Sequence, residues 1–227
     1  MLREVYGDLY RRARAACVPG LTLEVGGGSG NFKQTHPESL SLDILPAPWL
    51  DLVADAQRLP FRDGSVGNIV MLDVLHHIEY PLRFFREAAR VLAPGGRLVA
   101  IEPAITPCSW LPYSLLHEES VDMSVDPLRD GVPNAGKDPY LGNQAVPTLL
   151  ATRERSRLAQ LVPQLSHVAT KWLSLIAYPL SGGFQPWCLL STGAARAIVR
   201  LEDRMPRAVH RLCGFRLLLV WQRAVGL

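Results

Sequence analysis

The chain has 227 residues, enough for one α/β domain with a full hydrophobic core and too few for two independent domains. Its formal net charge of +3 is too small by itself to indicate a nucleic-acid-binding surface. No segment reaches the about 18 uninterrupted apolar residues of a membrane span, and the charged N-terminus does not resemble a signal peptide. The four cysteines lie far apart in the sequence with no C-x-x-C pair, which is typical of a reduced, cytoplasmic protein and does not predict a zinc site.

Helices and strands alternate in the first half of the predicted chain. A helix over residues 2–16, ended by Pro19-Gly20, is expected to pack before the first strand. Another helix is expected from Pro81 to Leu92, with a proline start and a Pro-Gly-Gly stop. The predicted strands cover residues 21–26, 39–43, 51–54, 67–73 and 97–102. This alternation predicts a doubly wound α/β fold whose ligand lies at the carboxyl ends of parallel strands.

A glycine-rich junction follows the first predicted strand. The run LTLEVGGGSGN begins at Leu21 and brings Glu24 just ahead of Gly26, Gly28 and Gly30. Because glycine has no Cβ, the backbone there can pass close to a ligand. The spacing is not the G-x-G-x-x-G of dinucleotide folds, and the preceding acid would repel a pyrophosphate. The junction therefore favours a positively charged ligand.

Two more acids end the next predicted strands. Asp43, with Ile44 beside it, stands nineteen positions after Glu24, and Asp55 is followed by Ala56. Asp43 is placed to accept hydrogen bonds from both ribose hydroxyls, and a bond to a charged acceptor contributes about 1.5–3 kcal/mol. Asp55 can accept from the exocyclic amine of an adenine. An adenosine with a cationic amino-acid tail, S-adenosylmethionine, fits all three acids.

Each acid alone has a plainer interpretation. Glu24 could cap the helix after the loop, a contribution of about 0.3–1 kcal/mol. Asp43 and Asp55 could be turn residues. Their ordered occurrence at three successive strand ends favours the cofactor interpretation.

Several motifs in order resemble the class I S-adenosylmethionine-dependent methyltransferases, in the branch that includes ubiquinone and menaquinone C-methyltransferases. They are LEVGGGSG at 23–30, ADA at 54–56 with LPF at 59–61, DGS at 63–65, VLHHI at 74–78 and RVLAPGGRL at 90–98. The resemblance implies a Rossmann-like sheet of seven mostly parallel strands, with an antiparallel last strand and helices on both faces.

The same resemblance implies roles for individual residues. Glu24 and the three glycines would surround the methionine moiety of S-adenosylmethionine, Asp73 would lie behind the sulfonium, and His76 would lie at the cofactor rim. One departure is Val66-Gly67, where the family usually has Phe-Asp before the fourth strand. Because that acid is normally structural, its loss concerns local order and not cofactor binding.

Candidate acceptor-side residues occur in two places. His76 and His77 follow the fourth strand, and both a packing role and base chemistry at His77 are open. Residues 104–147 form a Pro-, Gly- and Asp-rich insert with two cations and six acids. This insert is either a solvated acidic loop or a lid over the acceptor, in which His117 or Glu118 takes a proton. No spacing within it predicts a metal site.

The last part of the chain is basic. We expect a helix over 148–161, a strand over 168–177, a helix over 187–203 and a last strand over 215–222. Residues 185–227 carry seven arginines against Glu202 and Asp203. Apolar and aromatic residues in or near this region are core residues or form a face for peripheral contact with an anionic bilayer; they are Trp172, Trp187, Leu189, Leu190, Leu217, Leu218, Leu219 and Trp221.

We therefore predict a single methyltransferase domain over residues 1–227. Its parts are an N-terminal helix at 1–20, a cofactor-binding half at 21–103, the insert at 104–147 and an acceptor-side half at 148–227. The predicted reaction is methyl transfer to a small-molecule or lipid- or sugar-linked acceptor, with O-, N- and C-transfer and the oligomeric state left open.

Two alternative functions remain from other classes. One is a regulator that binds S-adenosylmethionine without turnover. The other is an NAD(P)-dependent oxidoreductase, although no Tyr is followed four residues later by Lys, as the short-chain dehydrogenase pair requires. A nucleic-acid partner is not predicted, because no basic stripe interleaved with aromatics crosses the predicted pocket rim.

Overall fold

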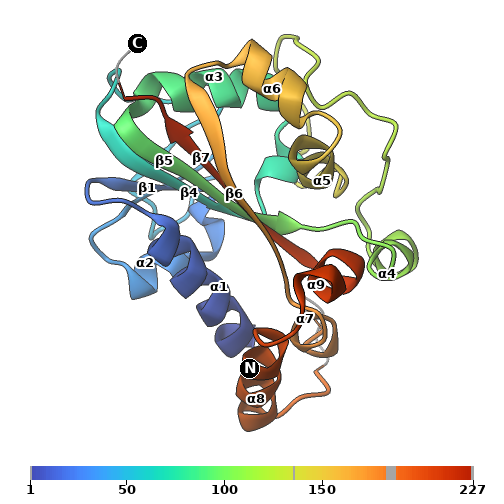
Figure 1. The fold of residues 1–227 in the computed structure, drawn as a ribbon. Coiled ribbons are helices and arrows are strands. Elements are labelled where there is room, and N and C mark those ends of the chain that lie inside the picture. The colour runs from blue at the N-terminus through green and yellow to red at the C-terminus, as the bar shows by residue number, and fades with distance from the viewer. Residues whose placement is uncertain (1, 135, 183–187, 226–227) are drawn as a thin grey trace.

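A seven-stranded sheet runs through the molecule with helices on both faces (Figure 1). The computed structural model describes residues 2–134, 136–182 and 188–225. The strand order is β3-β2-β1-β4-β5-β7-β6. The first five strands pair in parallel, and β7 is antiparallel to both β5 and β6. This topology confirms the predicted doubly wound sheet with an antiparallel last strand.

The strands are β1 (Thr22–Val25), β2 (Leu40–Asp43), β3 (Leu52–Val53), β4 (Val66–Leu72), β5 (Leu92–Pro103), β6 (Leu165–Leu173) and β7 (Arg216–Arg223). The α-helices are α1 (Leu2–Ala16), α2 (Asn31–Thr35), α3 (Pro81–Val91), α4 (Trp110–Leu116), α5 (Val146–Ala151), α6 (Arg155–Leu161), α7 (Ala177–Leu180), α8 (Thr192–Glu202) and α9 (Arg207–Cys213). Two short 3₁₀ turns, η1 (Gly27–Ser29) and η2 (Leu75–His77), follow β1 and β4.

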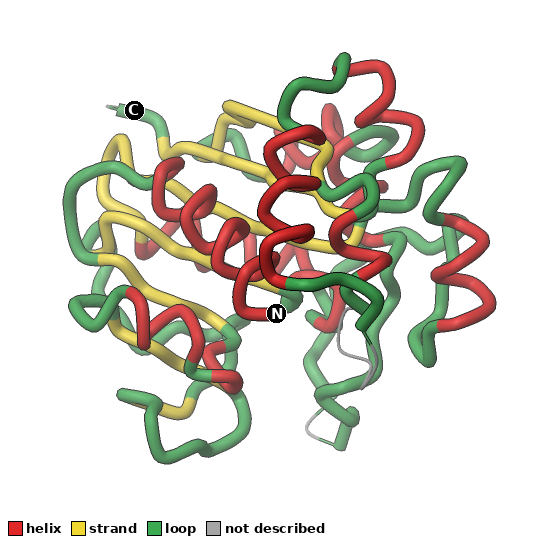
Figure 2. Tube along the Cα trace, turned by 90° about the horizontal axis from the view of Figure 1, so that it is seen from below, coloured by secondary structure: helices red, strands yellow, loops and turns green. Residues whose placement is uncertain are grey.

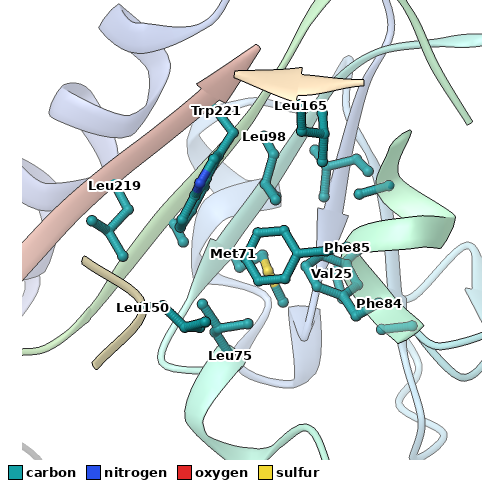
Figure 3. Close-up of a cluster of buried hydrophobic side chains, with 14 of the residues drawn as sticks. Val25, Met71, Leu75, Phe84, Phe85, Leu98, Leu150, Leu165, Leu219 and Trp221 are labelled. Carbon is teal, nitrogen blue, oxygen red and sulfur yellow. The ribbon is translucent and has the colours of Figure 1, made fainter. Parts of the chain in front are cut away.

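The two faces of the sheet bury alternate residues of each strand. On one face, Met71 and Trp221 pack against Phe85 of α3, and the Phe85 and Trp221 rings meet edge to face at 4.9 Å between centroids (Figure 3). On the other face, side chains of β4, β5 and β7 pack against α1; they are Val70, Val99, Ile101, Leu218 and Val220. This period of two is what a strand buried on both faces requires. Figure 2 shows the molecule from below, with helices lying over the strands and loops at both ends of the sheet.

Several predicted boundaries differ from the structure. The expected helix over 148–161 is two helices, because the chain turns at Thr152, whose φ of −121° and ψ of −95° are not helical. The expected strand over 168–177 is β6 at 165–173, and Ser174 follows it with a φ of +58°. The expected helix over 187–203 is α8, capped by the Ser191 side chain; residue 187 lies outside the described part of the chain. Helices α4 and α9 were not predicted.

The departure at Val66-Gly67 has a steric reason. A Cβ on Gly67 would lie 3.0 Å from the backbone of Gly20, so the position has little room for a side chain. The next residue, Asn68, is fully buried. Its Oδ1 accepts a hydrogen bond from the N–H of Val18 at 2.9 Å, and its Nδ2 donates to the carbonyl of Val18 at 2.8 Å. The amide of Asn68 therefore supplies local order at the start of β4.

The helices of the described residues include none that is both long and apolar enough to cross a bilayer.

Candidate functional site

The glycine loop lies at the carboxyl end of β1, where the predicted ligand site was placed. Gly26 has a φ of +80°, and a Cβ there would lie 2.0 Å from a methyl carbon of Val74. A Cβ on Gly28 would lie 2.9 Å from Oδ2 of Asp43. Because a side chain fits at neither position, the loop needs glycine for both its conformation and its close approach to neighbouring strands.

Glu24 precedes the loop and lies inside the protein. Only 4% of the residue is exposed, and its Oε2 accepts a hydrogen bond from Ser41 Oγ at 2.6 Å. Burial raises the pKa of Glu24 above its usual value, although the Ser41 hydrogen bond and the charge of Lys33 oppose the rise. Lys33 itself is ion-paired with Asp51. A cationic ligand group beside Glu24 would therefore relieve an unfavourable buried charge.

Asp43 follows on the neighbouring strand and fixes the loop. Its Oδ2 accepts from the N–H of Gly28 at 2.9 Å, and its Oδ1 accepts from the N–H of Leu45 at 3.0 Å. Val25 of β1 pairs with Leu42, so Glu24 and Asp43 belong to adjacent strand ends. The turn role considered for Asp43 is thus present, and its half-buried carboxylate remains at the same edge of the sheet.

Asp55 extends this edge beyond the outermost strand, β3. The N–H of Ala54 donates to Asp43 O at 2.9 Å, and Oδ1 of Asp55 accepts from the N–H of Gln57 at 2.8 Å. Ala56 is buried, whereas Ile44 is half exposed. The structure therefore brings the three predicted acids together in the order of the strands β1, β2 and β3.

Trp49 covers the glycine loop and was not predicted. Its Nε1 donates to Gly27 O at 3.1 Å, and a Cβ on Gly30 would lie 2.9 Å from the indole Cδ1. Nearly half of Trp49 is exposed. A tryptophan directly after a Pro-Ala-Pro run in a short connection was the signal in the sequence that could have identified it.

Asp73, predicted to lie behind the sulfonium, is held by two buried side chains. Tyr6 Oη donates to its Oδ2 at 3.0 Å, and Arg216 at the start of β7 forms a close ion pair with its Oδ1. Arg216 is 1% exposed and lies 4.8 Å from the ring centroid of Tyr178. The carboxylate of Asp73 is therefore already paired with the Arg216 guanidinium.

His76 lies between two carboxylates. Glu102, at the end of β5, is fully buried and contacts His76 Nδ1 at 2.6 Å through Oε2. Its Oε1 accepts from the N–H groups of Val74 and Leu75 at 3.0 and 2.8 Å, which fixes the start of η2. On the other side, His76 Nε2 lies 3.0 Å from Glu119 Oε2. Burial disfavours protonation, yet Glu102 and Glu119 outweigh it and raise the pKa of His76 to about 9.

His77 differs from its neighbour in charge. Burial and the adjacent His76 lower the pKa of His77 below its usual value, so its ring is neutral and able to accept a proton at neutral pH. Its Nε2 lies 3.7 Å from Glu119 Oε1. Glu118 is exposed, and His117 Nδ1 accepts from the N–H of Glu119 at 3.3 Å. The insert thus brings Glu119 to the histidine pair, whereas the proton-accepting role predicted for His117 or Glu118 stays a prediction.

The insert is tied to η2 by backbone as well as side chains. The N–H of Asn143 donates to His76 O at 2.9 Å, and Lys137 Nζ donates to His77 O at 3.0 Å. Two insert acids form ion pairs with arginines of the helices beside it: Asp130 with Arg86 at 2.6 Å and Asp126 with Arg157 at 2.8 Å. The description as a solvated acidic loop is therefore incomplete.

Several C-terminal residues suggested for a bilayer-facing surface can be compared with the structure. The structure buries Leu217, Leu218, Leu219 and Trp221 in the sheet, so these residues of the suggested bilayer face belong to the core. Trp187, which was part of the same suggestion, lies outside the described residues. Contact with a membrane stays a prediction.

The cysteines that are distant in sequence include one close pair. Sγ of Cys108, before α4, lies 2.7 Å from Sγ of Cys213, at the end of α9. Sequence spacing gave no sign of this pair, because 105 positions separate the two residues.

Sequence comparison matches residues 23–100 to the family model described as a methyltransferase domain. A demethylmenaquinone methyltransferase of Chlamydia trachomatis serovar L2 is 32% identical over 138 residues, which cover 61% of this chain and 51% of the relative. The chain thus spans about half the length of this curated relative.

Two solved structures have the same fold. A SAM-dependent methyltransferase from Archaeoglobus fulgidus aligns over 97% of this chain and 94% of its own, with a TM-score of 0.59 and 13% identity. The geranyl diphosphate C-methyltransferase of Streptomyces coelicolor A3(2), in complex with Mg2+, geranyl diphosphate and S-adenosyl-L-homocysteine, aligns over 96% and 81%, with a TM-score of 0.57 and 14% identity.

Proposed function

We propose that this chain is a class I S-adenosylmethionine-dependent methyltransferase that transfers the methyl group of S-adenosylmethionine to a small-molecule acceptor, a proposal supported by the matched methyltransferase domain at residues 23–100 and by the similarity to the relative from Chlamydia trachomatis. The observation that carries this proposal is the row of acids and glycines at the carboxyl ends of β1, β2 and β3. Ligands of open α/β sheets bind at this edge.

The residues at this edge fit the cofactor chemically. Glu24 is a buried carboxylate whose pKa is raised by burial, so it would hold the cationic methionine end. The backbone N–H of Gly28 positions Asp43, whose carboxylate would bind the ribose hydroxyls. Asp55 and Ala56 would contact the adenine. S-adenosylmethionine supplies an activated methyl group when bound.

The acceptor would bind beyond the end of β4, between η2 and the insert. Methyl transfer requires the acceptor to be aligned with the S–CH3 bond, and such positioning contributes about 7–11 kcal/mol. A base is needed when the acceptor atom is a hydroxyl, and the neutral His77 is the residue we assign to that role. Glu119 would orient His77, and His117 and Glu118 are the two residues just before Glu119.

A quinone-like ring is the first acceptor to test, since the relative from Chlamydia trachomatis carries the name demethylmenaquinone methyltransferase. Lipid-linked and sugar-linked metabolites belong in the same panel. The assay measures S-adenosylhomocysteine formation and searches for metabolites that gain the mass of one CH2 group. Calorimetry with S-adenosylmethionine and with NAD accompanies it.

The outcomes separate the rival functions. Cofactor binding with acceptor-dependent S-adenosylhomocysteine formation supports the proposal. Saturable S-adenosylmethionine binding without turnover in a metabolite extract would favour a regulator. Binding of NAD in place of S-adenosylmethionine would favour an oxidoreductase.

A further inference from the structure

We propose that His76, His77 and Glu119 form a binding site for a divalent transition-metal ion of the zinc class. Each residue offers one ligand atom, and these atoms all lie within 4.8 Å of one another. Two imidazoles and one carboxylate are a ligand set that suits zinc and its first-row neighbours better than magnesium or calcium.

The distances between these side chains agree with a small coordination sphere. Zinc bonds to nitrogen and oxygen are about 2.0–2.1 Å long, so neighbouring ligands of a tetrahedral ion lie about 3.3 Å apart. His76 Nε2 lies 3.0 Å from Glu119 Oε2, and His77 Nε2 lies 3.7 Å from Glu119 Oε1. The two distances to Glu119 are therefore within a few tenths of an ångström of the tetrahedral spacing, and side-chain rotations would bring all three ligand atoms, now within 4.8 Å of one another, around one ion.

The surroundings of His76 provide an independent observation. Histidines that bind metals usually direct their second ring nitrogen to a carboxylate, which fixes the ring and makes it a better ligand. Glu102 Oε2 contacts His76 Nδ1 at 2.6 Å, and Glu102 is itself held by the N–H groups of Val74 and Leu75. The Nε2 atom of His76 is thereby directed toward Glu119, and an ion bound there would displace the proton that this nitrogen shares with Glu119.

His77 and Gly142 complete the arrangement. The Nδ1 atom of His77 is buried without a hydrogen-bond partner among the described residues, so this ring is not fixed by the protein alone. A Cβ on Gly142 would lie 2.8 Å from that nitrogen, which shows how closely the insert backbone covers the ring. A metal ion would bind the other nitrogen, Nε2, which lies 3.7 Å from Glu119 Oε1 and beyond hydrogen-bond distance of it.

The site joins two parts of the chain. His76 and His77 belong to η2 at the end of β4, and Glu119 belongs to the insert. Three protein ligands leave a tetrahedral ion one open position, as in catalytic zinc sites. If the proposed methyl transfer holds, a bound ion would take the place of His77 as the base, because it would lower the pKa of an acceptor hydroxyl.

The test is a titration of the full-length, chelator-stripped protein with ZnCl2, followed by calorimetry and by metal analysis after dialysis. All proteins carry Cys108→Ser, because the sulfurs of Cys108 and Cys213 lie 2.7 Å apart and close thiols compete for zinc. Glu119→Gln and His77→Gln remove one ligand each. Glu118→Gln is the matched control, because its exposed carboxylate belongs to the same segment but not to the ligand group.

We expect one zinc ion per chain, at least about tenfold weaker binding in Glu119→Gln and His77→Gln, and unchanged binding in Glu118→Gln. Cobalt(II) should give the visible spectrum of a nitrogen and oxygen site. S-adenosylmethionine affinity, measured on the same proteins, reports on the cofactor site separately.

Absence of saturable zinc binding would overturn the metal site, even if the protein binds S-adenosylmethionine. Equal zinc affinity in Glu119→Gln and Glu118→Gln would overturn it as well. Preference for MgCl2 over ZnCl2 would also contradict the ligand chemistry proposed here.

Discussion

Replacement of Glu24 by Gln tests the charge complementarity of the cofactor site. The change keeps the size of the side chain and an oxygen that can accept from Ser41 Oγ, which now donates at 2.6 Å. It removes the buried negative charge. A hydrogen bond to a charged group contributes about 1.5–3 kcal/mol, so S-adenosylmethionine should bind about 10- to 150-fold more weakly.

The pH dependence of the same variant gives a second, independent readout. Burial raises the pKa of Glu24 in the free protein, so folding favours its protonated form and the ionised form costs stability at neutral pH. Glu24→Gln removes that cost, and the free variant should be at least as stable as the parent at neutral pH. A bound cation would lower the pKa of Glu24. The parent's cofactor affinity should therefore fall as the pH drops through the raised pKa of the free protein. The variant should lack this dependence.

Calorimetric titrations across the acidic range, together with urea unfolding of the free proteins, measure both effects. Glu38→Gln is the control, because Glu38 is exposed and its nearest cation is Arg14 at 3.9 Å. If Glu24→Gln binds S-adenosylmethionine as tightly as the parent at neutral pH, the assigned role of Glu24 is wrong.

Three further predictions concern other parts of the structure. Asp43→Ala removes the acceptor of the Gly28 N–H and the proposed ribose contact, so calorimetry should show at least about tenfold weaker S-adenosylmethionine binding, with Asp43→Asn intermediate. Arg216→Met leaves the half-buried Asp73 without its cation and should lower the free energy of unfolding, measured in urea, by about 3–5 kcal/mol. In the double variant with Asp73→Asn, part of this lost stability should return. Glutathione disulfide should oxidise Cys108 and Cys213 to a disulfide while it is itself reduced to two glutathione molecules, which mass spectrometry would show. The new disulfide should raise the free energy of unfolding by about 4 kcal/mol, measured in urea.

Each of these predictions has a clear contrary result. Unchanged cofactor affinity in Asp43→Ala would remove the ribose assignment. An Arg216→Met variant as stable as the parent would mean that the buried ion pair contributes little. Failure of oxidised glutathione to join Cys108 to Cys213, with a Cys108→Ser control treated in parallel, would show that the thiols do not approach each other in solution.

The cofactor half could be predicted because its determinants are local. Each strand ends in its own acid or glycine, and the sheet only needs to place those ends side by side. Gly26 and Gly28 are required by the close approach of Val74 and Asp43, and the glycine pattern in the sequence already indicated a close backbone approach.

The acceptor side could not be predicted in the same way, because its contacts join distant segments. Glu119 reaches His76 across 43 positions, Arg216 reaches Asp73 across 143, and the two paired cysteines are 105 apart. No periodicity distinguishes Glu119 from Glu118, and only the path of the insert decides which one faces the histidines. The break at Thr152 was likewise missed, because the polar run from Thr152 to Arg157 contains no Pro or Gly to mark the end of a helix.

A crystal structure of the protein with bound S-adenosylhomocysteine tests the central claim most directly. We predict the amino-acid end of the ligand beside Glu24 and the glycine loop, the ribose hydroxyls on Asp43 and the adenine near Asp55 and Ala56. A ligand bound away from the carboxyl ends of β1, β2 and β3, with these carboxylates left as they are, would contradict the account.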